Sequence, residues 1–254
     1  MSAILRTLAL HSLLIIGLVP AVLVAAPTKI LRAVVSDSNT PPYAIFDENG
    51  SLSAGLSKDI LDALASLAGS EIQYLDLPRA RIESWLESGQ ADIACFLNPD
   101  WVEKPALYLW SPPLFSTQQL FIRRADSPPI KALPDLAGKR VGTTRGFTYP
   151  ELEQVFALGD VIRDDAHTLQ SNLQRLEQGR LDVVMSVDLS YYFFMDQGGL
   201  GNFAADPIWS EPPSVYCAIS RFNSEQAAQL RSGLAELVSN QFISQQLSRY
   251  KGDN

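Results

Sequence analysis

A short word that occurs twice constrains the fold of this chain more than any other feature of its sequence. Residues 86–93, LESGQADI, recur as residues 176–183, LEQGRLDV, at an offset of 90 residues. In both copies a helical pattern ends at a glycine, which commonly follows a helix C-terminus, and an aspartate precedes an apolar run typical of a buried strand. A chance match of short words is the alternative. As a repeat, the two copies predict two similar α/β units with a cleft between them.

Strand-like runs alternate with helical patterns along the chain, which predicts sheets that are mainly parallel. Strands are expected at residues 30–35, 72–75, 93–97, 140–143, 161–163, 183–186 and 215–220. Helices are expected from an N-cap at Ser57 to Gly69, at 81–87, 150–157 and 169–177, and as one long stretch over 225–250.

The predicted architecture is a pair of Rossmann-like α/β lobes joined by a two-strand hinge. The chain does not begin a third unit after residue 206, and its last strand and long helix suit a return to the first lobe. Lobe 1 is therefore expected to contain residues 27–116 and 210–254, and lobe 2 residues 117–209.

The N-terminus has the composition of a secretory signal. A single positive charge, Arg6, precedes an apolar run that reaches the small residues Ala25 and Ala26. Residues 1–26 are predicted to be a signal peptide, cleaved after Ala25 or Ala26, and a retained membrane anchor is the alternative. Because no cysteine lies near the cleavage region, no lipid anchor is expected. The predicted location is the periplasm.

Charge and cysteine content narrow the classes of partner. The formal net charge of −8 becomes more negative once Arg6 is removed, and such a surface repels nucleic acid.

The two cysteines, Cys95 and Cys217, lie in apolar strand-like runs. An oxidising compartment would allow a disulfide between them, and buried reduced thiols are the alternative.

Several short motifs occur in an order that resembles a known family. They are Pro41-Pro42-Tyr43, an Asn49-Gly50 turn and the segments 55–61, 87–93, 110–115, 136–142 and 179–184. Their order and spacing, from Leu31 to Tyr250, resemble family 3 of the bacterial extracellular solute-binding proteins, the polar amino-acid receptors of ABC importers. The resemblance implies a Venus-flytrap receptor with the periplasmic binding protein type II fold.

The resemblance also implies two ligand-binding positions, and the chain departs from both. In the family, an arginine of the first lobe binds the α-carboxylate of the ligand and an aspartate of the second lobe binds its α-amine. Lys104 stands at the arginine position, and Val187 stands at the aspartate position with Asp188 beside it. Lysine attracts an anion but lacks the planar fork of arginine. Asp188 reaches the ligand only if the backbone turns it inward, because neighbouring residues of a strand face opposite sides.

Further candidates are indicated by their places in the predicted elements. Open α/β sheets bind ligands beyond the carboxyl ends of their strands, and the N–H groups at a helix N-terminus attract anions. In the first lobe the candidate ligand-binding residues are Asp37, Thr40 and Tyr43 after the first strand, Arg81 at a helix start, Asn98 after the third strand, and Lys104. In the second lobe they are Arg145, Phe147 and Thr148 in the strand-to-helix loop, and Asp188. Arg79, two residues before Arg81, is expected to be exposed to solvent instead.

The residues argue against an enzyme, a metal site and a cofactor. After removal of the signal, His167 is the only histidine, which leaves one candidate base for a serine triad. The cysteines are far apart in sequence and form no Cys-x-x-Cys pair, so a structural zinc site is not expected. No catalytic residue is predicted. A dehydratase-like enzyme on this fold is the remote alternative.

The predicted function is capture of a small polar metabolite, an amino acid or a related carboxylate, for an ABC importer. The expected partners are this ligand and an ABC permease, without nucleic acid, and the protein itself is expected to be a monomer. The alternative is a ligand-sensing or partner-binding module of the same fold without a transport role, because closure of the lobes can be read by either kind of partner.

Overall fold

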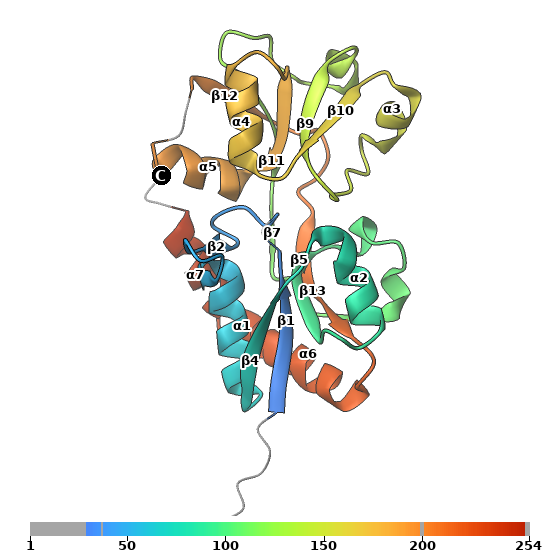
Figure 1. The fold of residues 1–254 in the computed structure, drawn as a ribbon, viewed down its shortest axis with the longest axis vertical. Helices are drawn as coiled ribbons and strands as arrows, with labels where there is room; N and C mark the ends of the chain where they lie inside the picture. The colour runs from blue at the N-terminus through green and yellow to red at the C-terminus, as the bar shows by residue number, and fades with distance from the viewer. Residues whose placement is uncertain (1–28, 37, 199–200, 252–254) are drawn as a thin grey trace, which may run out of the picture.

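Two α/β lobes lie one above the other along the long axis of the molecule (Figure 1). The computed structural model describes residues 29–36, 38–198 and 201–251. The predicted signal peptide and the candidate Asp37 lie outside these residues. Over the described part of the chain, no helix has the length and apolar character needed to cross a membrane.

Lobe 1, the lower lobe in Figure 1, is built on a sheet with strand order β4-β1-β5-β13-β6, and β7 also pairs with β13. The parallel strands are β1 (Lys29–Val35), β4 (Ser70–Asp76) and β5 (Ile93–Leu97). The strand β13 (Ser214–Ser220) runs antiparallel to β5, β6 (Tyr108–Trp110) and β7 (Phe115–Ser116). A separate hairpin pairs β2 (Ile45–Phe46) with β3 (Leu52–Ala54).

Helices cover both faces of the lobe 1 sheet. The helices are α1 (Leu56–Leu67), α2 (Arg79–Glu87), α6 (Ser224–Ser239) and α7 (Phe242–Tyr250). Side chains of α1, α6 and α7 share one core cluster with Leu31, Ala33 and Ile93, whereas α2 shares another with Val34 and Ala94. Alternate residues of a strand face opposite sides, so these two clusters lie on opposite faces of the sheet.

Lobe 2, the upper lobe, has the strand order β10-β9-β11-β8-β12. The strands β9 (Arg140–Thr144), β10 (Ile162–Ala166) and β11 (Val183–Val187) are parallel, and β8 (Gln119–Arg124) runs antiparallel to β11 and β12 (Phe203–Pro207). The helices are α3 (Glu153–Leu158), α4 (Leu169–Glu177) and α5 (Asp188–Asp196). The two sheets and their helices confirm the predicted two-lobed α/β architecture.

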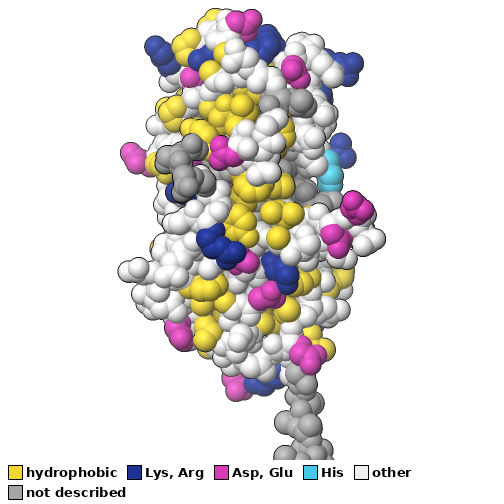
Figure 2. All heavy atoms as spheres, turned by 90° about the vertical axis from the view of Figure 1, so that its left-hand side faces the viewer, with side chains coloured by type: hydrophobic (Ala, Val, Ile, Leu, Met, Phe, Trp, Pro, Cys, Tyr) yellow, Lys and Arg dark blue, Asp and Glu magenta, His cyan; other side chains and the backbone are white. Residues whose placement is uncertain are grey.

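The chain passes between the lobes twice, from β7 to β8 and from β12 to β13. A third connection is made by packing, because Leu189 at the start of α5 belongs to the core cluster of lobe 1. On the face seen in Figure 2, hydrophobic side chains gather at the middle of the molecule, while charged side chains are frequent at its upper end. Apolar contacts therefore support the junction of the two lobes.

The repeated word forms the same structure in both lobes. It builds the end of α2 and the start of β5 in lobe 1, and the end of α4 and the start of β11 in lobe 2. Both of its glycines have positive φ, at 70° and 69°, where a side chain would be strained. The Asp92 carboxylate accepts a hydrogen bond from the Arg32 N–H at 2.8 Å, and Asp182 accepts one from the Arg140 N–H at 2.8 Å. Each aspartate thus ties its strand to the neighbouring one.

Helix α1 begins two residues earlier than the sequence indicated. Its N-cap is Gly55, and Ser57 makes no capping bond. Gly55 has φ 108°, and a Cβ built there would lie 2.8 Å from the Pro42 carbonyl oxygen. The Gly55 N–H donates to the Tyr250 hydroxyl at 3.2 Å. A close backbone approach between distant segments therefore determines this helix start, and the Ser57 capping prediction is wrong.

The long C-terminal helix predicted over residues 225–250 is two helices. Helix α6 ends at Ser239, and Gln241 adopts the left-handed conformation with φ 65° before α7 begins. The side-chain oxygen of Asn240 accepts a hydrogen bond from the Phe242 N–H at 3.0 Å, which supports the new helix start. Asparagine forms such local bonds readily and so competes with helix continuation. The break lets both helices pack on the lobe 1 core.

Cys95 and Cys217 form a disulfide. The sequence had left open whether these cysteines pair or remain as buried reduced thiols. They face each other across the antiparallel pair β5 and β13. The bond joins positions 122 residues apart, and the whole of lobe 2 lies within that loop. The disulfide therefore fixes the segment that returns from lobe 2 to the lobe 1 sheet.

Candidate ligand-binding site

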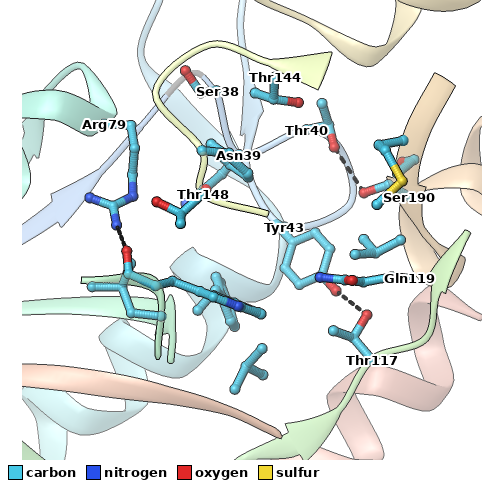
Figure 3. A pocket seen from close by; sticks show the side chains of 18 of the residues that line it. Ser38, Asn39, Thr40, Tyr43, Arg79, Thr117, Gln119, Thr144, Thr148 and Ser190 are labelled. Carbon is cyan, nitrogen blue, oxygen red and sulfur yellow. Dashed lines mark hydrogen bonds between the residues drawn. The ribbon is translucent and has the colours of Figure 1, made fainter. Parts of the chain in front are cut away.

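A cavity of about 110 Å³ lies between the lobes and is lined by both of them (Figure 3). At about 30 Å³ per water in the liquid, this is the space of about four waters. Its polar lining residues are Ser38, Asn39, Thr40, Arg79, Thr117, Gln119, Thr144, Thr148, Ser186 and Ser190. Its aromatic lining residues are Tyr43, Phe96, Trp101, Phe147 and Tyr149. A small molecule of mixed polar and apolar character fits such a wall.

The loop after β1 brings Thr40 and Tyr43 to the cavity. Tyr43 is buried, and its ring contacts Phe96 at a centroid distance of 5.0 Å. The Thr117 hydroxyl donates to Asp188 at 2.9 Å, so the Tyr43 hydroxyl, 3.4 Å away, donates to Thr117. Burial raises the pKa of Tyr43, and the nearby Asp188 charge raises it further, while the hydrogen bond to Thr117 acts in the opposite direction. The net pKa is raised, so the phenol stays neutral.

Arg79 at the start of α2 is the charged side chain of the cavity wall. It is 8% exposed, donates from Nη2 to the Trp101 carbonyl oxygen at 3.0 Å, and pairs through Nη1 with Glu83 at 3.3 Å. Two of its donor groups are therefore already engaged. Arg79 holds the Trp101 segment in place, and its charge is largely balanced by Glu83.

Lobe 2 contributes the loop between β9 and α3. The Tyr149 hydroxyl accepts a hydrogen bond from the Thr144 N–H at 2.9 Å, which closes the loop on itself. Arg163 stacks over the Tyr149 ring at 5.4 Å and donates to the Phe147 carbonyl oxygen at 2.8 Å. Burial raises the pKa of Tyr149, so the Tyr149 hydroxyl that accepts this hydrogen bond stays uncharged. The loop is thus held in place before any ligand is bound.

Two contacts join the lobes across the cavity. The hydroxyl groups of Thr40 in lobe 1 and Ser190 in lobe 2 are hydrogen-bonded at 2.8 Å (Figure 3). Gly146 of the lobe 2 loop has φ 79°, and a Cβ built there would lie 3.3 Å from Cβ of Arg79 in lobe 1. The lobes therefore stand in a closed arrangement around the cavity.

The ends of β8 and β11 form the lobe 2 side of the wall. Gln119 and Val187 pair directly across these antiparallel strands, and both line the cavity. Gln119 is 6% exposed, and its side-chain Oε1 is buried without a hydrogen-bond partner. Buried polar atoms without partners are rare in folded proteins and require an explanation.

Four of the residues predicted from sequence line the cavity: Thr40, Tyr43, Phe147 and Thr148. Five others do not: Arg81, Asn98, Lys104, Arg145 and Asp188. Asp37 lies outside the described residues, although its neighbour Ser38 is part of the wall. Whether these residues bind a ligand stays a prediction.

The two arginines of α2 are placed opposite to expectation. Arg81 is exposed, whereas Arg79, which was expected to be solvated, lines the cavity. Residues two apart on a helix point in nearly opposite directions, so only one of them faces the cleft. Lys104 is also directed away, since its side chain is 60% exposed and lies 3.9 Å from Glu87. Arg145 is exposed at the rim of its loop.

Asn98 and Asp188 lie beside the site and perform structural tasks. The Asn98 side chain accepts from the Asp100 N–H and donates to the Ser214 carbonyl oxygen, both at 2.8 Å. One Asp188 carboxylate oxygen accepts from Thr117 at 2.9 Å and from the Leu189 N–H at 2.8 Å. Each side chain fastens a crossover between the lobes.

Several lining residues could not be found from the sequence, for identifiable reasons. Phe96 belongs to a strand, but it sits at a register irregularity between β5 and β13 and has φ 62°. Such a bulge redirects a side chain and leaves no local sequence signal. Gln119 and Ser190 come to the cavity through the crossover and through lobe closure. The proximity of these residues is a tertiary property.

No group of three or more His, Cys, Asp or Glu residues within the described ranges could hold a metal ion. Arg79 is also the one charged side chain among the lining residues that the structure describes. Hydrogen bonding and apolar contact are therefore the interactions that these side chains offer to a ligand.

A family model matches nearly the whole described chain. It is the model of the bacterial extracellular solute-binding proteins, family 3, and it matches residues 33–253. The probable ABC transporter extracellular-binding protein YckB of Bacillus subtilis (strain 168) is 24% identical over 159 residues. That match spans 61% of this chain and 55% of the relative's length.

Solved structures share the fold at low sequence identity. An ancestral arginine-binding protein bound to arginine is 23% identical with a TM-score of 0.74, covering 88% of this chain and 98% of that one. A structure concerning glutathione import in Streptococcus mutans through GshT and the cystine ABC importer TcyBC is 19% identical with a TM-score of 0.75, covering 89% and 95%. A histidine kinase sensor domain similar to periplasmic binding proteins is 23% identical with a TM-score of 0.71, covering 89% and 97%.

Proposed function

Because the chain belongs to family 3 of the bacterial extracellular solute-binding proteins, we propose that it captures a small polar metabolite in the periplasm and presents it to an ABC importer. The export signal predicted at residues 1–26 supports the location. The YckB relative, named as a probable ABC transporter component, supports the transport role.

The observation that carries the proposal is the cavity with walls from both lobes. Residues of lobe 1 and lobe 2 face each other across it and touch at Thr40 with Ser190 and at Arg79 with Gly146. A ligand that contacts both walls binds the closed arrangement better than an open one, and it shifts the population toward closure. A permease can then distinguish the loaded protein from the empty one by its shape.

The family resemblance favours an amino acid or a related carboxylate as the ligand. The ancestral arginine-binding protein described as bound to arginine supports the first of these classes. The sensor-domain neighbour supports a second candidate function, in which closure is read by a signalling partner instead of a permease. The two functions share the binding step and differ in the partner that reads closure.

Capture is tested by a thermal-shift screen of residues 27–254 against amino acids, organic acids, amides, polyamines and sugars. A ligand that binds the folded form raises the melting temperature by mass action. Small-angle X-ray scattering on each hit reports closure. A folded, monomeric protein that responds to no compound, in either measurement, would contradict the capture function.

Transport is tested separately by uptake of a labelled hit in cells with and without the gene. Loss of uptake in the deletion strain is the expected result. Unchanged uptake together with a hit that closes the protein would favour the sensing role. The paired variant Thr40→Val with Ser190→Ala serves as a control, because it removes a cross-lobe hydrogen bond and is expected to weaken the hit about tenfold.

A further inference from the structure

Helix α5 lies at the junction of the lobes and packs on both of them. Leu189 in its first turn is 4% exposed and belongs to the lobe 1 core cluster, whose other buried members all come from lobe 1. Tyr191, two residues further along, belongs to a core cluster of lobe 2. Residues two apart on a helix point in nearly opposite directions, so the start of α5 is held between the two cores. Part of lobe 2 is thus anchored in the core of lobe 1.

The residues on either side of Leu189 bind the same region. The Asp188 carboxylate accepts a hydrogen bond at 2.9 Å from the hydroxyl of Thr117, which lies in the first crossover. Ser190 is 1% exposed, and its hydroxyl is hydrogen-bonded to that of Thr40 in lobe 1 at 2.8 Å. Three consecutive residues at the start of α5 therefore contact lobe 1 or the crossover that leads from it.

Lobe 2 meets lobe 1 in a different way on the other side of the cavity. Figure 3 shows Arg79 on one side of the cavity and the hydrogen-bonded Thr40 and Ser190 on the other. On the Arg79 side, the loop between β9 and α3 approaches lobe 1 through Gly146, where a Cβ would lie 3.3 Å from Cβ of Arg79. Gly146 and the preceding Arg145 are both exposed. This contact therefore lies at the surface, whereas the contact of Leu189 lies in a core.

We propose that the first turn of α5 is a pivot that stays on lobe 1 while the rest of lobe 2 rotates, so that the cleft opens between Gly146 and Arg79. Separating a buried leucine from a core exposes apolar surface to water, whereas separating a surface contact at a glycine exposes little. Leu189 is not among the described residues that line the cavity, so it is a positioning residue that sets the direction of closure. This inference rests on the proposed capture function in one respect: the ligand enters on the Gly146 side.

Distances between spin labels on the empty protein, residues 27–254, test the pivot by double electron–electron resonance. Both cysteines of the chain are in the disulfide, so introduced cysteines are labelled selectively. Ser84→Cys in α2 with Gln154→Cys in α3 reports the Gly146 side, and Gln245→Cys in α7 with Asp196→Cys in α5 reports the pivot side (Figure 1). All four positions are exposed.

The label pair on α2 and α3 is expected to show distances that extend at least about 5 Å beyond the distance in the structure, because that side of the cleft opens. The pair on α5 and α7 is expected to keep a single narrow distance. An equal or larger spread in the α5 and α7 pair would overturn the proposal. Narrow single distances in both pairs would also overturn it, because the Gly146 side would then not open.

Two leucine variants separate the pivot from general stability. Leu189→Ala removes the contact of α5 with lobe 1, and Leu173→Ala truncates a fully buried leucine of a lobe 2 core cluster. Both should lower the melting temperature, because each leaves a cavity. Leu189→Ala alone is expected to widen the α5 and α7 distance distribution, by about twofold. A distribution as narrow as that of Leu173→Ala would overturn the role of Leu189. Leu189→Val makes the same comparison with a smaller truncation if the alanine variant does not fold.

Failure of this inference is distinguishable from failure of the proposed function, because the distances are measured without a ligand. A protein that shows both expected distributions but responds to no compound of the library keeps the pivot and loses the capture function. A protein that responds to a compound but has a wide α5 and α7 distribution keeps the capture function and loses the pivot.

Discussion

Lobe 1 and lobe 2 repeat one structural unit but stabilise it by different means. In lobe 1, Asp92 is buried, and it binds both the Arg32 N–H at 2.8 Å and the Arg32 guanidinium at 2.6 Å. In lobe 2, Asp182 is exposed and accepts from the Arg140 N–H, while the Arg140 guanidinium pairs with Asp164 at 3.2 Å. Lobe 1 also contains the disulfide.

The difference assigns the lobes different tasks. The core strands of lobe 1 are held by a disulfide and by an ion pair whose carboxylate is buried, and the lobe presents Tyr43 and Phe96 to the cavity. Lobe 2 contains no cysteine, its ion pairs range from the largely buried Arg123–Asp206 pair to the more exposed Arg140–Asp164 pair, and it presents a loop around Gly146 that touches lobe 1. We infer that lobe 1 is the more rigid half and that lobe 2 is the half that closes on it. Four predictions test this comparison.

The largest effect is expected from removing the disulfide. Replacing Cys95 and Cys217 by alanine should lower the free energy of unfolding by about 3–5 kcal/mol, because the bond closes a loop of more than a hundred residues. Hydrogen exchange should increase in β5 and β13 far more than in β9 and β11. Equal increases in both sheets would show that the disulfide does not distinguish the lobes.

The two aspartates of the repeat provide a matched pair. Asp92→Ala should cost about 2–4 kcal/mol, because it removes three hydrogen bonds to a buried carboxylate, two of them from the Arg32 side chain. Asp182→Ala should cost about 1 kcal/mol or less, because that carboxylate is exposed. Urea denaturation of both variants measures the difference. Costs of the same size would remove the distinction between the two copies.

A glycine pair in lobe 2 separates closure from stability. Gly146→Val and Gly138→Val both place a side chain at positive φ, 79° and 72°, and each should cost about 1–2 kcal/mol of stability. Gly146→Val also introduces methyl groups against Arg79, whereas a Cβ at Gly138 meets nothing within 4 Å. Ligand affinity should therefore fall about tenfold in Gly146→Val and remain near the original value in Gly138→Val. Calorimetry with any screening hit measures both.

Acid should destabilise lobe 2 by a small amount. Hydrogen bonds from Arg175, with a smaller contribution from Arg140, lower the pKa of Asp164 despite partial burial, and bonds from the Lys131 and Ala132 N–H groups lower the pKa of Asp135. A carboxyl whose pKa is lower in the folded state than its ordinary value of 3.8 stabilises the folded state at pH values above 3.8. That contribution is lost as the pH falls through the lower, folded-state pKa.

Below about pH 4, hydrogen exchange in β9 and β10 should therefore rise before exchange in β1 and β5 does. Asp164→Asn should remove part of this acid sensitivity, on the order of 0.5–1 kcal/mol. Asp160→Asn serves as a control because Asp160 is an aspartate of lobe 2 that is exposed, whereas Asp164 is partly buried. Acid opening of lobe 1 first would contradict the comparison.

Much of the fold could be predicted because its signals are local. The strand 93–97 and the helix 169–177 have the bounds of β5 and α4, since apolar periodicity and glycine ends are written in neighbouring residues. The helix ends that were predicted wrongly depend on distant partners. Gly55 meets Pro42 and Tyr250, and the left-handed Gln241 breaks a stretch whose composition suits a continuous helix.

The site could be predicted only in part, for the same reason. Thr40 and Thr148 follow strands at the edge where α/β sheets bind ligands, and both line the cavity. Lys104 was a candidate through resemblance alone, and its side chain is exposed to solvent. Sequence spacing indicates which loop a residue occupies, but not the direction in which its side chain points.

The sequence by itself determined the family, the two-lobed α/β class and the repeated aspartate at the start of each central strand, because these depend on periodicity and short-range order. The tertiary structure decided which residues meet in the cavity. Gln119 and Val187 become neighbours through strand register, Phe96 enters through a bulge, and the lobes touch only after the chain has crossed twice between them. Contacts between segments far apart in sequence are created by packing, and no local pattern encodes them.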